Sequence, residues 1–530
     1  MTASLEKADG DENISTTVAD HAVVTIQQTR RGLSPRHVQL MTIAGGIGVG
    51  LFVGVGGVLS KAGPLPLIIG YLIYGLGFIW PTMLNVAEMV AWLPIRGSIY
   101  ELASRFVDPA LGFAMGWTYF YAGAMLVCTE YSAVATVMQY WNTDINPAVW
   151  IAIALSVCYF MNMVAVRWYG EAEFIMGSTK ILLILGLIMA TFITMVGGNP
   201  HHDAYAGEIR NPRKTIPKVA KLIVGRILFF YVVGILAVGI ICNSRDPRLL
   251  GAIETGEAGA AASPWVLGLL RLDIRGFLPG LINFLILLSG WSCGNAYLYS
   301  SSRTLYSLAQ DGQAPKIFLR CTKSGVPWVC VTAVTAISLL SFLVASNSAS
   351  EVFSWFLDLT TVALVVNFTA MTWVFIGWRR ALNAQGITRQ GENNFKKSLF
   401  KRNSDKQPAP GIMFPFTAPC ASWTPYLCLF IGGSTSIFIG FDIFQPWSLK
   451  GFITSYFGLA WFFFMFIFWK VFKRTKFVTP ATVDIFADGK KQAVDEECRF
   501  WEEGFGDEAE RDALAKKHVV VRTWARFWGG

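Results

Sequence analysis

Glycine is concentrated at one point of an apolar segment, the run Gly45-Gly46-Ile47-Gly48-Val49-Gly50. A glycine inside a helix costs about 1 kcal/mol relative to alanine, so four of them in this run predict an interrupted helix. The backbone N–H groups freed by such a break lie at the positive end of the next helix, which favours a bound carboxylate. We therefore interpret residues 45–50 as a ligand-binding segment. The alternative is close packing against another helix through small residues.

Two ionisable side chains fall inside apolar runs, where a charge is costly and therefore indicates function. Glu130 follows Cys128 and Thr129 in the third run, and Lys180 lies in the fifth. A buried lysine releases its proton more easily than an exposed one, so we predict Lys180 as the first proton-coupling residue and Glu130 as the second. The alternatives are a structural hydrogen bond for Glu130 and, for Lys180, a side chain that reaches to the membrane surface.

Small and polar residues also gather in the apolar run that begins near residue 276. From Ser289 to Tyr306 serine, glycine, asparagine and tyrosine recur, with Asn295 in the middle. Such a face lines either an aqueous path or a neighbouring helix. We include Ser289 and Asn295 with residues 45–50 and Glu130 in the predicted substrate site.

The composition indicates which elements position these residues. Apolar residues make up 53% of 530 positions, charged residues 15%, and the mean hydropathy is +0.46. Charge this sparse is typical of a helical membrane protein with a lipid bilayer as its partner. The net charge of +9 comes from basic loops between apolar runs, so we predict no nucleic-acid partner. No phosphate loop, zinc-spaced cluster or nucleophile–base set occurs, which makes an enzyme the weakest interpretation.

Eleven apolar runs are long enough to span a bilayer as helices, because lipid cannot satisfy the backbone of an open sheet. We predict tails at 1–31 and 473–530 and a transmembrane domain at 32–472. Residues 1–31 lack the apolar core of a signal peptide. The runs lie near 38–60, 64–93, 111–138, 148–166, 173–197, 222–243, 276–302, 326–345, 351–378, 425–447 and 451–470.

The distribution of basic residues disagrees with eleven spans. With a cytoplasmic N-terminus the first loops obey the positive-inside rule, but after the fifth run the rule is reversed. The loop 379–407, with eight Lys and Arg residues, would then be extracellular. One additional span between Val196 and Tyr205 corrects every later loop, yet only the polar stretch 197–204 lies there. We therefore predict that a whole helix is missing from this sequence.

Four motifs, in the same order along the chain, resemble those of a known family. The sequence from about residue 32 to 500 is similar to the fungal amino-acid permeases, the yeast amino acid transporter branch of the amino acid–polyamine–organocation superfamily. The motifs are Gly-Ile-Gly-Val-Gly-Leu-Phe at 46–52, Arg-Phe-Val-Asp-Pro-Ala-Leu-Gly-Phe at 105–113, Gly-Glu-Ile-Arg-Asn-Pro-Arg-Lys-Thr-Ile-Pro at 207–217, and Ser-Arg-Thr-Leu-Tyr-Ser-Leu-Ala-Gln-Asp-Gly-Gln-Ala-Pro-Lys at 302–316.

The resemblance implies an all-α polytopic protein with LeuT-like inverted five-helix repeats and twelve spans, of which the sixth is absent here. It also implies proton-driven uptake of an amino acid at the plasma membrane, with both tails cytoplasmic, no cofactor besides the proton, and possible trafficking factors that bind the tails. The substrate would lie at breaks in the first and sixth helices. Gly46 and Val49 replace two threonines of the family's first-helix motif, so the substrate itself stays open.

Two other functions remain open at this point. Related permeases carry polyamines, choline or carnitine, and a nutrient sensor would bind a ligand without transporting it. For the chain as given we expect impaired folding or no transport, because half of the substrate site would be missing.

Overall fold

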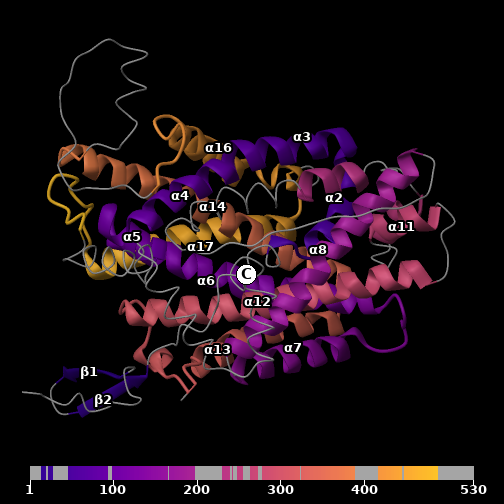
Figure 1. The fold of residues 1–530 in the computed structure, drawn as a ribbon, viewed down its shortest axis with the longest axis horizontal. Helices are drawn as coiled ribbons and strands as arrows, with labels where there is room; N and C mark the ends of the chain where they lie inside the picture. Colours follow the sequence, from indigo (N-terminus) through magenta and orange to yellow (C-terminus); the bar gives the residue numbers. More distant parts are fainter. Residues whose placement is uncertain are drawn as a thin grey trace, which may run out of the picture.

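Helices dominate the computed structural model of the protein (Figure 1). The structure describes residues 14–19, 22–27, 46–93, 98–164, 166–196, 230–238, 242, 247–254, 263–271, 277–322, 324–387, 416–444 and 447–486. The helices of the first half are η1 (Gly50–Gly54), α2 (Val55–Ala62), α3 (Pro64–Tyr74), η2 (Gly75–Ile79), α4 (Trp80–Trp92), α5 (Ser98–Phe106), α6 (Pro109–Met138), α7 (Pro147–Val164) and α8 (Val166–Val196). Those of the second half are α10 (Pro247–Glu254), α11 (Pro264–Arg271), α12 (Phe277–Gln310), η4 (Lys316–Leu319), α13 (Trp328–Ser338), η5 (Leu339–Ala345), α14 (Ala349–Ala384), α16 (Thr424–Phe438), η6 (Phe441–Ile443) and α17 (Leu449–Lys473).

The helical membrane class predicted from the sequence is confirmed. Within the described residues, six helical segments are long and apolar enough to cross a bilayer: Pro64–Trp92, Pro109–Met138, Phe277–Gln310, Trp328–Ala345, Ala349–Ala384 and Leu449–Lys473. Four shorter apolar helices coincide with other predicted runs: Gly50–Ala62, Pro147–Met163, Ile175–Met189 and Thr424–Phe438. The count of eleven spans and the inverted repeats stay predictions, and the stretch 197–204 lies outside the described residues.

One element departs from an all-helical chain. Strands β1 (Ile14–Ala19) and β2 (Ala22–Gln27) pair antiparallel in the N-terminal segment, with Ile14 opposite Gln27 and Ala19 opposite Ala22. Both strands contain several β-branched residues, which favour extended backbone, so this hairpin has a local sequence signal that the all-helical prediction leaves out.

Helix α6 forms the centre of the bundle and packs against α12, α14 and α17 (Figure 1). It runs antiparallel to α12, because Trp117 near its start donates from Nε1 to the Gln313 carbonyl (3.2 Å) just beyond the end of α12. Small residues permit the close approach. A Cβ on Gly123 would lie 2.2 Å from Ser301 Oγ and 3.3 Å from its Cβ, so a larger residue there would have to displace the Ser301 side chain.

The direction of α8 restricts what connects it to α12. Early in α8, Glu173 contacts Asn295 of α12, whereas Ile184, farther along, lies with Trp265 of α11 around Gly234. Because α11 immediately precedes α12, α8 ends at the end of the bundle where α12 begins. An even number of crossings must then separate the two helices, yet only one apolar run, 222–243, lies between them. The arrangement of the described helices therefore agrees with one absent span.

A buried carboxylate joins three segments at the opposite end of the bundle. Asp108 caps α6 by accepting a hydrogen bond from Ala110 N (2.8 Å) and another from Thr475 Oγ1 (2.8 Å), and it pairs with Lys470 of α17. Beyond α17, Val478 N donates to the Val107 carbonyl (2.8 Å). The first part of the predicted C-terminal tail thus packs against the helix ends.

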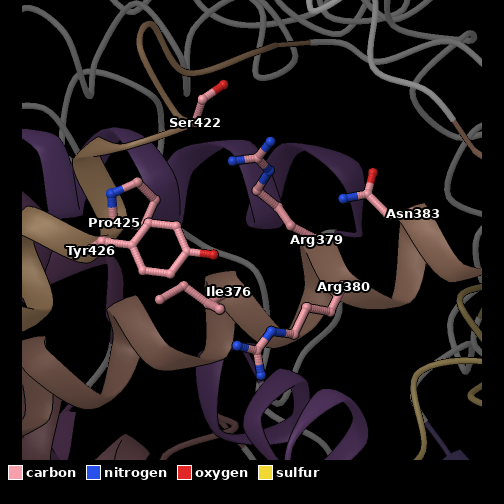
Figure 2. Close-up of a pocket in the computed structure, with 7 residues that line it drawn as sticks. All are labelled: Ile376, Arg379, Arg380, Asn383, Ser422, Pro425 and Tyr426. Carbon is pink, nitrogen blue, oxygen red and sulfur yellow. The ribbon is translucent and has the colours of Figure 1, made fainter.

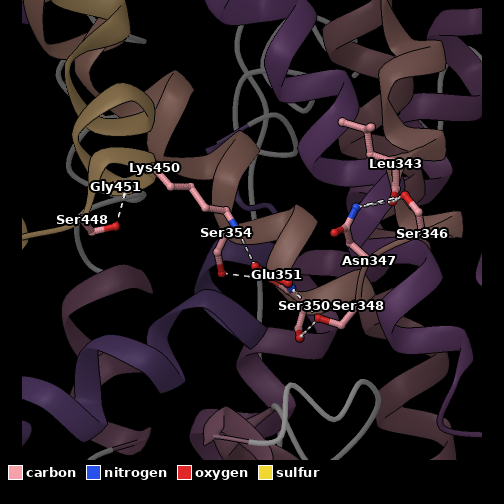
Figure 3. Close-up of polar contacts among 10 residues, drawn as sticks. All are labelled: Leu343, Ser346, Asn347, Ser348, Ser350, Glu351, Ser354, Ser448, Lys450 and Gly451. Atoms are coloured by element: carbon pink, nitrogen blue, oxygen red, sulfur yellow. Dashed lines mark hydrogen bonds and ion pairs between the residues drawn. The ribbon is translucent and has the colours of Figure 1, made fainter.

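Exposed polar contacts join the beginnings of α14 and α17 (Figure 3). Ser348 caps α14 by accepting from Glu351 N, and Ser448 caps α17 by accepting from Gly451 N. Lys450 pairs with Glu351 between the two caps, and both side chains are about half exposed. Solvent weakens such an ion pair, so the caps contribute more to this junction than the pair does.

We predict that Asp108→Ala lowers the free energy of unfolding by about 2–4 kcal/mol, because it removes a helix cap and the carboxylate partner of Lys470 together. The thermal midpoint of the detergent-solubilised protein measures this loss.

Glu351→Gln is the matched control, since it removes a carboxylate from an exposed pair and should cost less than about 1 kcal/mol. Equal losses in the two variants would contradict the assigned role of Asp108.

Candidate functional site

The first apolar run contains the predicted helix interruption. The backbone departs from helical geometry at Ile47 and Gly48 and becomes helical again from Val49. Gly50 then begins the π-helical turn η1, and Gly45 lies outside the described residues. The interruption is confirmed by this geometry, whereas the binding of a ligand to it stays a prediction.

The carbonyl groups at the interruption point toward other helices. Ile47 O accepts hydrogen bonds from Ser289 Oγ (3.3 Å) and from Cys293 Sγ (3.4 Å), both on α12. Gly46 O accepts a hydrogen bond from Tyr231 OH (2.8 Å). The break therefore presents acceptor groups that polar side chains from later in the chain satisfy, as buried backbone requires.

Glu130 lies directly against the break. A Cβ built on Gly48 would be 2.5 Å from Glu130 Oε1, so a larger residue there would displace this carboxyl group. The side chain is buried, and its Oε2 atom has no hydrogen-bond partner within the described residues. The position expected for the carboxylate of a substrate thus borders on a carboxyl group of the protein itself.

Lys180 is enclosed on the inner side of α8. Its side chain is 0% exposed, and Nζ donates to Cys293 Sγ of α12 (3.1 Å). Full burial disagrees with the alternative in which this lysine reaches to the membrane surface. Because Cys293 also contacts the Ile47 carbonyl, one thiol connects Lys180 to the broken helix.

Sequence reasoning missed Glu173, the second carboxylate of the cluster. Its Oε1 accepts a hydrogen bond from Ser292 Oγ (2.5 Å) and its Oε2 one from Asn295 Nδ2 (3.4 Å). Asn295 Oδ1 in turn accepts from Asn162 Nδ2 of α7 (2.8 Å). Glu173 was overlooked because it lies at the edge of a predicted span. Its spacing of seven residues from Lys180, two helical turns, was the available signal that both share a face.

The cluster contains more acidic than basic groups. Lys180 interacts electrostatically with both Glu130 and Glu173, and all three side chains are buried. If all three were ionised, one negative charge would remain uncompensated in a region of low dielectric constant. Glu173 receives two side-chain hydrogen bonds that favour its ionised form, whereas Glu130 receives one from the backbone of Val49 and its Oε2 has no partner among the described residues. The three groups therefore leave one carboxylate charge without compensation when all of them are ionised.

We predict that Glu173→Ala destabilises the protein by about 3–5 kcal/mol, because Ser292 and Asn295 lose their acceptor and only Glu130 is left to compensate the buried Lys180 charge. Thermal unfolding in detergent measures the loss, and the double variant Glu173→Ala/Lys180→Met should recover part of it because it removes both charges.

Ser292→Ala serves as control, since it removes one hydrogen bond and leaves the charges, at a cost of about 1–3 kcal/mol. A double variant less stable than Glu173→Ala would show that the two charges do not compensate each other.

Comparison with known proteins shows similarity along most of the chain. The amino acid permease family model matches residues 37–206 and 204–401. The proline-specific permease of Emericella nidulans is 36% identical, over 89% of this chain and 90% of its own length. The proline-specific permease of Saccharomyces cerevisiae is 34% identical, over 84% and 76%. The dicarboxylic amino acid permease of the same yeast is 31% identical, over 93% and 85%.

The alignments also differ in length from the chain. The alignment with the Emericella nidulans permease is 521 positions long but contains only 89% of the 530 residues of this chain. About fifty alignment positions therefore hold no residue of this chain. The alignment with the Saccharomyces cerevisiae proline-specific permease shows the same excess, since it is 500 positions long and contains 84% of this chain. The two segments matched by the family model meet at residues 204–206.

Three findings lead to one assignment. The family model matches most of the described helices, the relatives are more than 30% identical over most of their length, and the architecture is that of a helical membrane protein. The chain belongs to the amino acid permease family, whose members named above are transporters and not enzymes.

Proposed function

We propose that the intact protein takes up amino acids across the plasma membrane as a proton symporter that works by alternating access. The observation that carries this proposal is the buried cluster of Glu130, Glu173 and Lys180 beside a broken helix. A neutral zwitterion brings no net charge to such a site, so a proton is the simplest partner for the surplus carboxylate.

Glu130 supplies a physical link between proton and substrate. Its carboxyl group lies where the N–H groups after Gly48 would receive a substrate carboxylate, and two carboxylates repel each other there. Protonation neutralises Glu130 and removes this repulsion, so the proton binds before the amino acid. The substrate ammonium would then meet carbonyl groups of the break, such as those of Gly46 and Ile47.

The same charge balance revises the order of the two proton-coupling candidates. The sequence placed Lys180 first, but a charged Lys180 beside a charged Glu173 leaves Glu130 as the group that gains and loses the proton. Lys180 then acts as a fixed positive charge that holds Cys293 against the broken helix.

We further propose that the chain has lost the sixth helix of a twelve-span permease. Three independent features support this: the reversed charge bias after the fifth run, the odd number of apolar runs between α8 and α12, and about fifty unmatched alignment positions. The two family segments that meet at 204–206 indicate the place. The missing helix would provide half of the substrate site.

The relatives suggest which amino acids to test first. Two relatives carry the name proline-specific permease and one the name dicarboxylic amino acid permease. Polyamines, choline and carnitine stay alternative substrates, because the surplus carboxylate of the cluster also suits a cation. Competition of radiolabelled proline uptake by glutamate, arginine, spermidine and carnitine separates these substrates, and binding without flux would indicate a sensor.

We predict that the 530-residue chain shows no saturable proline uptake in a fungal host deleted for its own amino-acid permeases. A chimera that receives the missing segment from the Emericella nidulans permease between residues 196 and 207 should transport. Saturable uptake by the unrepaired chain at equal surface expression would refute the loss of function, and transcript sequencing across this position tests the origin of the gap.

In the repaired chimera, Glu130→Gln should make uptake independent of external pH and abolish accumulation against a gradient, while exchange of internal for external amino acid continues. The physical reason is that glutamine mimics a permanently protonated Glu130. The uptake of radiolabelled amino acid at several external pH values measures this pH dependence.

Glu88→Gln is the control for a buried carboxyl group elsewhere, since Glu88 accepts a hydrogen bond from Ala418 N (2.7 Å) far from the cluster. Unchanged pH dependence in Glu130→Gln, or its equal loss in Glu88→Gln, would contradict the coupling role of Glu130.

A further inference from the structure

A cavity of about 220 Å³ lies between the end of α14 and the beginning of α16, apart from the charge cluster. Figure 2 shows its lining side chains, with the guanidinium groups of Arg379 and Arg380 above and below the phenol oxygen of Tyr426 in this view. The lining consists of Ile376, Arg379, Arg380, Asn383, Ser422, Pro425 and Tyr426.

The two arginines make this cavity a site for an anion. Arg379 is held in place because it donates a hydrogen bond to the buried Ala421 carbonyl. Arg380 has no hydrogen bond or ion pair with any described residue, and none of the seven lining residues is acidic. Two guanidinium groups with an amide and hydroxyl groups nearby match the several oxygens of a phosphate.

An apolar track leads away from the cavity along α16. Tyr426, Phe430 and Ile437 are 55%, 71% and 60% exposed, and the helical period places them on one face. Gly433 lies between the last two, and a Cβ there would meet nothing within 4 Å. On a membrane helix this face contacts lipid, and the gap at Gly433 leaves space for an acyl chain. A water-soluble anion would gain nothing from such a track.

The position in the bundle selects a leaflet. The end of α14 lies with the end of α17, because Gln385 Nε2 donates to the Val483 carbonyl (2.6 Å). Lys470, Lys473 and Arg474 lie at this end of α17, so basic residues are concentrated here, as expected on the cytoplasmic side. Anionic phospholipids are concentrated in that leaflet.

We propose that this cavity binds an anionic phospholipid of the cytoplasmic leaflet, with the lipid phosphate between Arg379 and Arg380 and an acyl chain along the Tyr426–Phe430–Ile437 face. Phosphatidylserine, an anionic lipid of this leaflet, is the headgroup to test first. The cavity lies outside the region of the missing helix, whereas its assignment to the cytoplasmic leaflet rests on the twelve-span topology of the proposed function.

Native mass spectrometry of the full chain in mild detergent, titrated with phosphatidylserine, tests this site. We expect Arg380→Gln to weaken the first binding step at least about tenfold, since it removes one charge-assisted contact. Arg380 is exposed, so this variant keeps its fold, and Arg379→Gln/Arg380→Gln should lose the step entirely. Lys473→Gln/Arg474→Gln is the matched control, because it removes two positive charges at the same end but outside the cavity.

Three results would overturn the proposal. Equal weakening in the control pair would indicate attraction by surface charge alone. Equal binding of phosphatidylcholine would indicate no selection of an anionic headgroup. Inorganic phosphate that displaces the lipid at similar concentration would indicate a site for a soluble anion, with no contribution from the apolar face of α16.

Discussion

Three ionisable side chains, Glu130, Glu173 and Lys180, are enclosed between helices α6, α8 and α12, and the rest of the site depends on how their charges are compensated. A charge in the membrane interior is tolerated only with a partner or hydrogen bonds. Ser292 and Asn295 supply hydrogen bonds to Glu173, and Cys293 receives one from Lys180. The polar residues of about one turn of α12, from Ser292 to Asn295, are therefore explained by one electrostatic requirement.

That requirement also explains the close packing of the bundle. Polar groups of α6 and α12 can compensate each other only if the two backbones approach closely, and small residues allow this. Gly123 faces Ser301, and Gly294 faces the ring of Tyr131 at 2.8 Å from a built Cβ. The unwound backbone at Ile47 and Gly48 belongs to the same compensated region, since its carbonyls accept from α12. Irregular backbone is possible at this depth because protein, not lipid, surrounds it.

Much of this arrangement could be predicted from the sequence. Apolar length and glycine content indicated the spans and the break, and the rule that buried charges signify function singled out Glu130 and Lys180. Glu173 was not predicted, because a carboxylate at the edge of an apolar run is expected at the surface. Only the tertiary structure shows that a neighbouring helix covers it. The hairpin of residues 14–27 depends on local β propensity, which a hydropathy pattern does not contain. The packing of residues 474–486 near Asp108 depends on tertiary contacts, which hydropathy does not predict either.

The central claim is that one surplus buried carboxylate, Glu130, binds the proton that accompanies each amino acid. The number of protons taken up per proline, measured in proteoliposomes containing the repaired chain with a pH-sensitive dye and radiolabel in parallel, tests it most directly. The account predicts one proton per proline, and none in Glu130→Gln although exchange persists. A ratio unchanged by Glu130→Gln would contradict it.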